Sequence, residues 1–73
     1  MKIKGWEKKG DTYNRIIYLN TDGSRIRNQV DVYKDYDNLW TINYGRPVME
    51  KTLKTKAQAL AFAIQYMKSH PNG

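Results

Sequence analysis

The chain has no cysteine, so neither a disulfide bond nor a thiolate metal site can stabilise it. It also lacks an apolar run near the ~18 residues that a membrane-spanning helix needs, and its first residues lack the apolar core of a secretory signal. We therefore expect an intracellular, cytoplasmic protein without a membrane partner. At 73 residues the chain is expected to form a single small domain, 1–73. A domain of that size buries only ~60% of the surface that its unfolded form exposes.

The sequence is also poor in the patterns that mark catalysis and metal binding. The single histidine, His70, lies beside Pro71 with no serine, cysteine or second histidine placed to act with it. Asp31, Asp35 and Asp37 lack the glycine and the terminal glutamate of a calcium loop, so we assign them to turns. The sequence therefore indicates no enzyme, no cofactor, no metal and no small-molecule substrate.

Basic and aromatic residues are what the chain has in excess. It carries 13 Lys and Arg against 7 Asp and Glu, a net charge of +6, together with two Trp and six Tyr. Cations attract a phosphate backbone whatever its sequence, and flat aromatic rings can stack on bases. This composition favours a nucleic-acid partner, although tyrosines and cations also serve packing and solubility in small sheets.

Most of the chain has the composition of β-strands separated by turns. Residues 25–34 alternate, with Ile26, Val30 and Val32 on one face and polar or basic side chains on the other. Residues 39–44 place Trp40, Ile42 and Tyr44 on a common side. Turn signals bound each segment, among them the Asn20 to Gly23 hairpin turn. The predicted strands cover residues 2–9, 12–19, 25–34, 39–44 and 48–54.

A single helix is predicted over residues 56–69. Thr55 and Gln58 have the spacing of a capping box, and Pro71 lies where a helix should stop. The expected apolar stripe follows helical periodicity and is widened by four further residues; it consists of Ala57, Leu60, Ala61, Ile64 and Met67, then Ala59, Phe62, Ala63 and Tyr66. The fold class is therefore α+β, an antiparallel sheet of four to five strands with one C-terminal helix packed on one face.

One helix covers one face of such a sheet, which leaves the other face wet, covered by another chain, or free to bind. The basic and aromatic residues that we expect to contact nucleic acid there are Trp6, Tyr13, Arg15, Arg25, Arg27, Tyr33, Lys34 and Arg46. The arginines and the lysine would neutralise phosphates, and the aromatic side chains would contact bases or sugars. A solvated strand face would need similar residues, so the pattern alone does not separate the two interpretations.

Two further features bear on the site. Trp40, between Leu39 and Ile42, is expected in the core, whereas Trp6, near the amino end, is expected to be partly exposed. Lys51, Lys54 and Lys56 lead into the helix, where backbone N–H groups attract phosphate. Lys56 stands at the end of the helix dipole that disfavours a cation, which hints at function, although these lysines can equally be solvated edge residues.

Two stretches resemble the arm-type DNA-binding domains of phage and transposon tyrosine recombinases. Residues 18–25, YLNTDGSR, look like the first hairpin of those domains, and residues 53–59, LKTKAQA, look like the T-K-x-x-A entry to their helix. The resemblance implies a sheet that enters the major groove of DNA. The segment between the two stretches is longer here and would hold an extra hairpin. Sheet-plus-helix modules that bind single strands, of the transcription-coactivator type, fit the same coarse pattern.

These observations leave two hypotheses of different classes. The first is a small nucleic-acid-binding module, DNA more than RNA, that uses the helix-free face of its sheet. The second is a protein-interaction or self-associating structural module, a homodimer for example, that uses the apolar helix surface around Phe62 and Tyr66 or the open sheet face.

Overall fold

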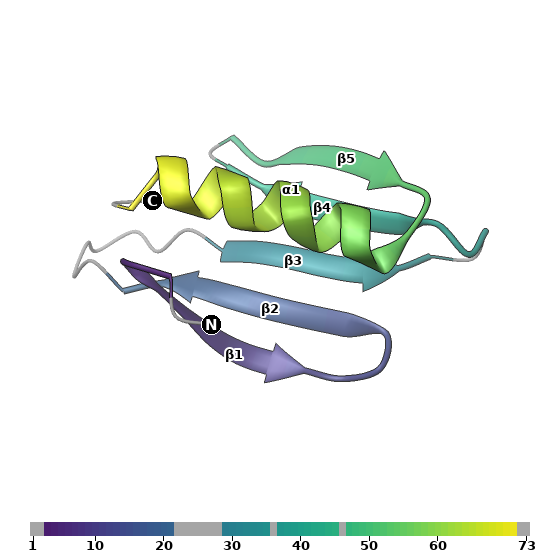
Figure 1. Cartoon of the computed structure of the whole chain (residues 1–73), viewed down its shortest axis with the longest axis horizontal. Helices are drawn as coiled ribbons and strands as arrows, with labels where there is room; N and C mark the ends of the chain where they lie inside the picture. Colours follow the sequence, from purple (N-terminus) through teal and green to yellow (C-terminus); the bar gives the residue numbers. More distant parts are fainter. Residues whose placement is uncertain (1–2, 22–28, 36, 46, 72–73) are drawn as a thin grey trace.

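In the computed structural model, the described residues are 3–21, 29–35, 37–45 and 47–71. They form a five-stranded antiparallel sheet whose spatial order follows the chain, β1-β2-β3-β4-β5, with one helix after the last strand (Figure 1). The α+β prediction is confirmed. The elements are β1 (Trp6–Asp11), β2 (Arg15–Asn20), β3 (Gln29–Lys34), β4 (Trp40–Tyr44), β5 (Met49–Leu53) and α1 (Lys56–Ser69).

The first strand differs most from its prediction. It begins at Trp6, and Gly10 and Asp11, expected to form a turn, pair with Ile17 and Ile16 of β2. A shift of register between Lys8 and Gly10 places a β-bulge there instead. The remaining strands lie within a few residues of their predicted bounds, except that the start predicted for β3, residues 25–28, lies outside the described residues.

The core lies between the sheet and the helix. Val30, Val32 and Ile42 are fully buried there, and Val32 is paired with Ile42 and with Ile16 across the neighbouring strands. These residues alternate along their strands with polar ones, as the sequence predicted for residues 25–34. Trp40 is buried too, which confirms its assignment to the core.

Helix α1 lies across β3, β4 and β5 (Figure 1). Its three fully buried residues are Ala59, Ala63 and Met67, so the buried stripe is centred beside the one predicted. Ala57 and Ala61, expected on the apolar face, are exposed. Small alanine side chains at the contact let the helix backbone approach the sheet closely.

The helix ends as the sequence indicated. The Thr55 hydroxyl accepts a hydrogen bond from the Gln58 backbone N–H at 3.1 Å, which satisfies one of the free donors of the first turn. At the other end the His70 N–H donates to the Met67 carbonyl, and Pro71 follows. The predicted helix over residues 56–69 is confirmed.

The end of the helix is fixed to the start of the sheet by a group of contacts that we call the terminal clasp: Gly5, Trp6 and Asn20 against His70 and Pro71. The Trp6 indole N–H donates to the His70 carbonyl at 2.9 Å, and the Asn20 amide donates to the Pro71 carbonyl at 3.1 Å. The Trp6 ring also meets the edge of Tyr66, 6.3 Å between centroids. Trp6 is therefore buried, and the prediction that it is partly exposed is wrong. The helix end covers it, which a local pattern does not reveal.

Candidate nucleic-acid interface

The face of the sheet turned away from α1, here called the helix-free face, is polar. Successive side chains along a strand point to opposite faces of the sheet. The residues that precede and follow each residue buried under the helix therefore lie on the helix-free face. No other described helix lies over it. The register of the five strands assigns to it Glu7, Arg15, Ile17, Leu19, Gln29, Asp31, Tyr33, Thr41, Asn43, Glu50 and Thr52.

An ion pair joins β2 and β3 on this face. The Arg15 Nε donates to Asp31 Oδ1 at 3.0 Å and its Nη2 donates to Asp31 Oδ2, a bidentate pair between β2 and β3. The Asp31 side chain is only 8% exposed, whereas the Arg15 side chain is 55% exposed. Hydrogen bonding to Asp31, and then its charge, raise the pKa of Arg15. The sequence suggested that Asp31 forms a turn, but it lies inside β3 and binds Arg15.

Fixing the arginine has a consequence for binding. A guanidinium group has five N–H donors, and Asp31 takes only some of them. The remaining donors of Arg15 face solvent in a position that is already set, so a ligand that accepts from them need not order a free side chain. Asp31 thus prepares Arg15 to donate, while it also cancels part of the positive charge.

Arg15 and Asp31 border a shallow hollow of about 440 Å³ at one end of the sheet. Tyr33 lies directly across from Arg15 in the β2–β3 register. The hollow is lined by Asn14, Arg15, Asp31, Tyr33, Lys34 and Asn43. The hollow thus holds two cations, two amides, a phenol ring and the Asp31 carboxylate, which is paired with Arg15. Apart from that carboxylate, these groups are suited to a ligand with phosphate oxygens, polar base edges and a flat face.

The structure thus brings together three of the predicted site residues, Arg15, Tyr33 and Lys34. Strand alternation puts Lys34 on the helix side, but it borders the hollow where β3 ends. Tyr13 is 82% exposed in the turn between β1 and β2, next to Asn14. Trp6 is excluded from the face because it is buried under the helix end. The predicted residues Arg25, Arg27 and Arg46 lie outside the described residues.

Sequence reasoning missed the two amide side chains of the hollow. Asn43 is the register partner of Asp31. Asn14 lies in the turn before β2, and its backbone carbonyl accepts a hydrogen bond from the Lys34 N–H at 2.9 Å. The alternation of β4 already places Asn43 on the other face of the sheet from Ile42, so the sequence pattern could have predicted the face of Asn43. The pattern could not predict that Asn43 lies near Arg15, because this depends on the pairing of three strands, β2, β3 and β4.

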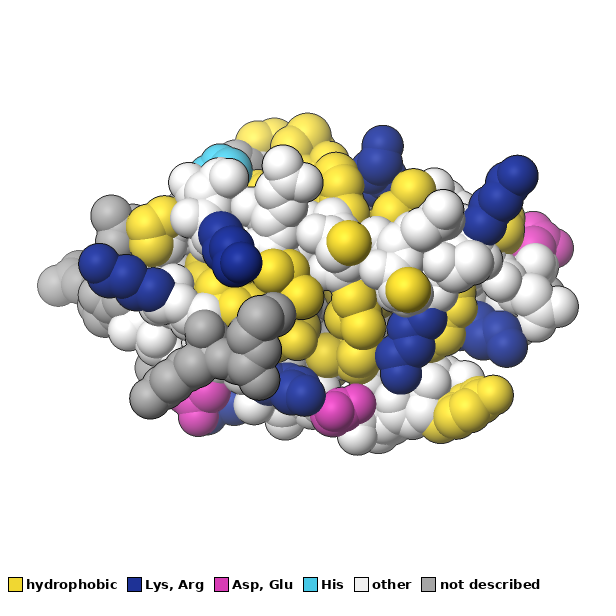
Figure 2. Space-filling view, in the orientation of Figure 1, with side chains coloured by type: hydrophobic (Ala, Val, Ile, Leu, Met, Phe, Trp, Pro, Cys, Tyr) yellow, Lys and Arg dark blue, Asp and Glu magenta, His cyan; other side chains and the backbone are white. Residues whose placement is uncertain are grey.

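Charge is distributed differently from what was expected. On the helix-free face the described charged residues are Arg15 against Glu7, Asp31 and Glu50, with Lys9 joined to Glu7 by an ion pair of 3.3 Å. This described portion carries no positive surplus. On the helix side, Lys and Arg side chains are scattered over the face and its rim (Figure 2).

Two of the three lysines that lead into the helix, Lys51 and Lys56, lie over aromatic rings. The Lys56 ammonium lies 5.7 Å from the centroid of the Trp40 ring, and that of Lys51 lies 5.4 Å from the Phe62 centroid. A cation over an aromatic face is attracted by the electrons of the ring. This contact compensates for the unfavourable place of Lys56 at the helix start, which the sequence left unexplained. The hint of function at Lys56 is correspondingly weaker.

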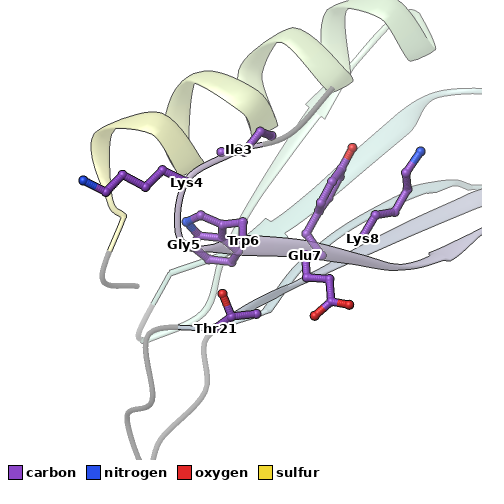
Figure 3. A pocket seen from close by; sticks show the side chains of 8 residues that line it. Ile3, Lys4, Gly5, Trp6, Glu7, Lys8 and Thr21 are labelled. Atoms are coloured by element: carbon purple, nitrogen blue, oxygen red, sulfur yellow. The ribbon is translucent and has the colours of Figure 1, made fainter.

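A second hollow of about 680 Å³ lies beside the start of β1 (Figure 3). Its lining combines apolar and charged side chains: Ile3, Lys4, Gly5, Trp6, Glu7, Lys8, Tyr18 and Thr21. The Trp6 N–H is already bound to the His70 carbonyl, and the Lys8 ammonium to Asp11 at 3.0 Å. That ion pair raises the pKa of Lys8. The first hollow lies on the helix-free face and contains more of the predicted site residues, so we take it as the candidate site.

Comparison with protein-family models, curated proteins and solved structures finds no match for this chain. Within the described residues, no three His, Asp or Glu side chains gather in a way that could hold a metal ion. The same residues include no helix long and apolar enough to cross a membrane.

Proposed function

We propose that the protein is a small basic nucleic-acid-binding module that uses the helix-free face of its sheet. The observation that carries the proposal is the convergence of Arg15, Tyr33 and Lys34 with two amide side chains in one hollow of that face. The net charge of +6 supplies long-range attraction to a polyanion.

Each group of the hollow has a role in this proposal. Arg15, held by Asp31, donates to a phosphate or to a base edge, and Lys34 neutralises a phosphate at the end of β3. Tyr33 provides a ring for stacking or a hydroxyl for a phosphate. Exposed Tyr13 extends the contact beyond the sheet. Arg25, Arg27 and Arg46 are proposed as additional phosphate contacts on the basis of sequence.

DNA is the proposed partner in preference to RNA. The major groove of B-form DNA admits β-strands, and its base edges differ for each base pair. The major groove of an A-form RNA helix is too narrow for side chains to read. A sheet face with polar side chains therefore fits duplex DNA better.

Fluorescence anisotropy with labelled duplex DNA, single-stranded DNA and RNA, over a series of salt concentrations, tests the proposal. We expect log Kd for duplex DNA to rise linearly with the logarithm of the salt concentration, because each phosphate neutralised by the protein releases counterions. The variants Lys34→Ala and Tyr33→Ala should each weaken binding several-fold, and Arg25→Ala with Arg27→Ala should lower the salt slope by about 2.

Lys68→Ala is the matched control, because Lys68 is exposed in the last turn of the helix, and it should bind like the natural chain. Arg15 is better tested by Arg15→Lys than by alanine, since alanine would leave the buried Asp31 carboxylate without its ion-pair partner. Absence of binding at low salt, or affinity that is indifferent to salt, would contradict the proposal.

The competing hypothesis, a protein-interaction surface on the helix around Phe62 and Tyr66, has less support. Both rings pack against Tyr44, each at 5.1 Å between centroids and in edge-on geometry. They are half-buried within the molecule, so they do not form an unpartnered patch.

A further inference from the structure

The two edges of the sheet, β1 and β5, are protected to different degrees. The edge strand β1 has a bulge between Lys8 and Gly10, and ion pairs join Lys8 to Asp11 and Lys9 to Glu7. Bulges and charged side chains are the devices by which natural sheets prevent their edges from pairing with other chains.

Strand β5 also carries charged residues, Glu50 and Lys51, but it lacks the bulge of β1. Its register with β4 runs without a shift from Met49 to Leu53, so one side of a regular five-residue strand is left open. Its first four residues are exposed, and Val48, just before it, is 72% exposed. Val48 and Met49 are two of three large hydrophobic side chains exposed among the described residues. Figure 2 shows hydrophobic side chains at one end of the edge where β5 runs in Figure 1, and Lys or Arg side chains along the rest of that edge.

We infer that a second copy of this chain pairs with β5, antiparallel, across a two-fold axis perpendicular to the sheet. Such an axis brings one residue of β5 opposite the same residue of the other copy, and that residue can be Met49, Glu50, Lys51, Thr52 or Leu53. The registers centred on Glu50 and Lys51 set like charges directly opposite, which destabilises a strand pair. Those centred on Met49 and Leu53 bring no opposite charges of β5 together.

The register centred on Thr52 is the complementary one. It sets Glu50 of each copy opposite Lys54, the residue after the end of β5, in the other copy, which gives two reciprocal ion pairs, and it sets Lys51 opposite Leu53. Glu50, Thr52 and Lys54 are all exposed in the single chain. The charges of the edge therefore complement those of a second copy in this register.

This pairing continues the sheet through both copies. Because the axis is perpendicular to the sheet, both helices lie on the same side and the two helix-free faces form one longer surface. The inference does not rest on nucleic-acid binding, since pairing of β5 needs no ligand. Its contact area is small, so the association should be weak and should depend on protein concentration.

Sedimentation equilibrium of the full chain over a range of concentrations tests it, without nucleic acid. We expect a reversible monomer–dimer equilibrium. Glu50→Lys should raise its dissociation constant tenfold or more, because residue 50 of each copy would then place a lysine opposite Lys54 of the other. The exchanged pair, Glu50→Lys with Lys54→Glu, should restore the dimer. Glu7→Lys makes the same change of charge at the β1 edge and should leave the dimer unchanged.

Cross-linking tests the register. The chain has no cysteine, so a single introduced one reports a single contact. Thr52→Cys should form a disulfide-linked dimer on mild oxidation, and much faster than Lys9→Cys on the β1 edge, because directly opposed residues have nearby Cβ atoms. Circular dichroism confirms that each variant is folded. A monomer at every concentration, a dimer that is indifferent to Glu50→Lys, or faster cross-linking by Lys51→Cys would overturn the inference.

Discussion

The two faces of the sheet are held together by different interactions. On the helix side, Val30 and Val32 are fully buried by packing against neighbouring strands and α1. On the other side of the same strand, Asp31, between these two valines, is almost as deeply buried, and an ion pair with Arg15 satisfies its carboxylate. The difference shows that burial in a small sheet does not require a second apolar layer.

The two kinds of burial should differ in their contribution to stability. Apolar burial on the helix side removes hydrocarbon from water and leaves no polar atom to satisfy. On the helix-free face, the gain from the ion pair is offset by the desolvation of a carboxylate, and half of the pair is still solvated. The helix side therefore carries the stability, and the other face is free to serve binding.

The largest expected effect tests this division with one substitution on each face. Ile42→Ala removes a fully buried side chain and should cost about 2–5 kcal/mol, which is a large part of the stability of so small a domain. Ile17→Ala, on the helix-free face and only half-buried, should cost clearly less. Urea denaturation followed by tryptophan fluorescence measures both, and Ile42→Val serves if the alanine variant does not fold. Equal costs would contradict the comparison.

The next effect concerns the terminal clasp that fastens the helix to the sheet. A Cβ on Gly5 would lie 2.0 Å from the Pro71 carbonyl oxygen, and Gly5 has a φ of +83°, so Gly5→Ala should destabilise by about 1–3 kcal/mol. Gly10→Ala is the matched control, since its Cβ would meet Ile17 at an ordinary 3.7 Å. Thermal unfolding compares the two variants. A variant of Gly5 as stable as that of Gly10 would show that the clasp is not required.

The ion pair of the helix-free face should have a moderate effect. Asp31→Asn keeps the shape of the side chain but removes the charge that binds Arg15, and it should cost about 1 kcal/mol, a value reduced by the exposure of Arg15. Asp37→Asn makes the same change in an exposed turn and should be nearly neutral. If Asp31→Asn proved as costly as Ile42→Ala, the two faces would contribute alike.

The smallest effect is a dependence on alkaline pH. Burial, and to a lesser extent the nearby Tyr44, raise the pKa of Tyr66 in the folded protein. The contribution of the neutral Tyr66 hydroxyl to folding stability is therefore fully present below the pKa of an unfolded tyrosine, ~10. It is lost as the pH rises through the higher pKa of Tyr66 in the folded protein. Tyr66→Phe should change stability by less than about 0.5 kcal/mol at neutral pH and lose less than the natural chain above pH ~10. Parallel losses in both proteins would exclude Tyr66 as the cause.

Local sequence patterns predicted the elements well where one interaction dominates. The capping residue Thr55 and the following helical periodicity gave the helix its bounds. The alternation around Val30 and Val32 gave the two faces of β3. Patterns failed at β1, where Gly10 suggested a turn, because a glycine also fits a bulge within a strand.

The candidate site was predictable only in part. That Arg15 and Tyr33 share a face follows from alternation, but the ion pair that holds Arg15 depends on the β2–β3 register. Trp6 was misplaced for a similar reason. Its burial comes from residues 66–71, far along the chain, which pack over it only when the helix has docked.

The amino-acid sequence by itself determined the α+β composition, the bounds of the helix and the net charge of +6. Each of these depends on neighbours within a turn or a strand, or simply on a sum over residues. Tertiary structure alone decided that Trp6 lies in the core, that Asp31 binds Arg15, and that the edge of β5 is left open. These depend on which distant segments meet, and that is set by the docking of the helix and the register of the strands.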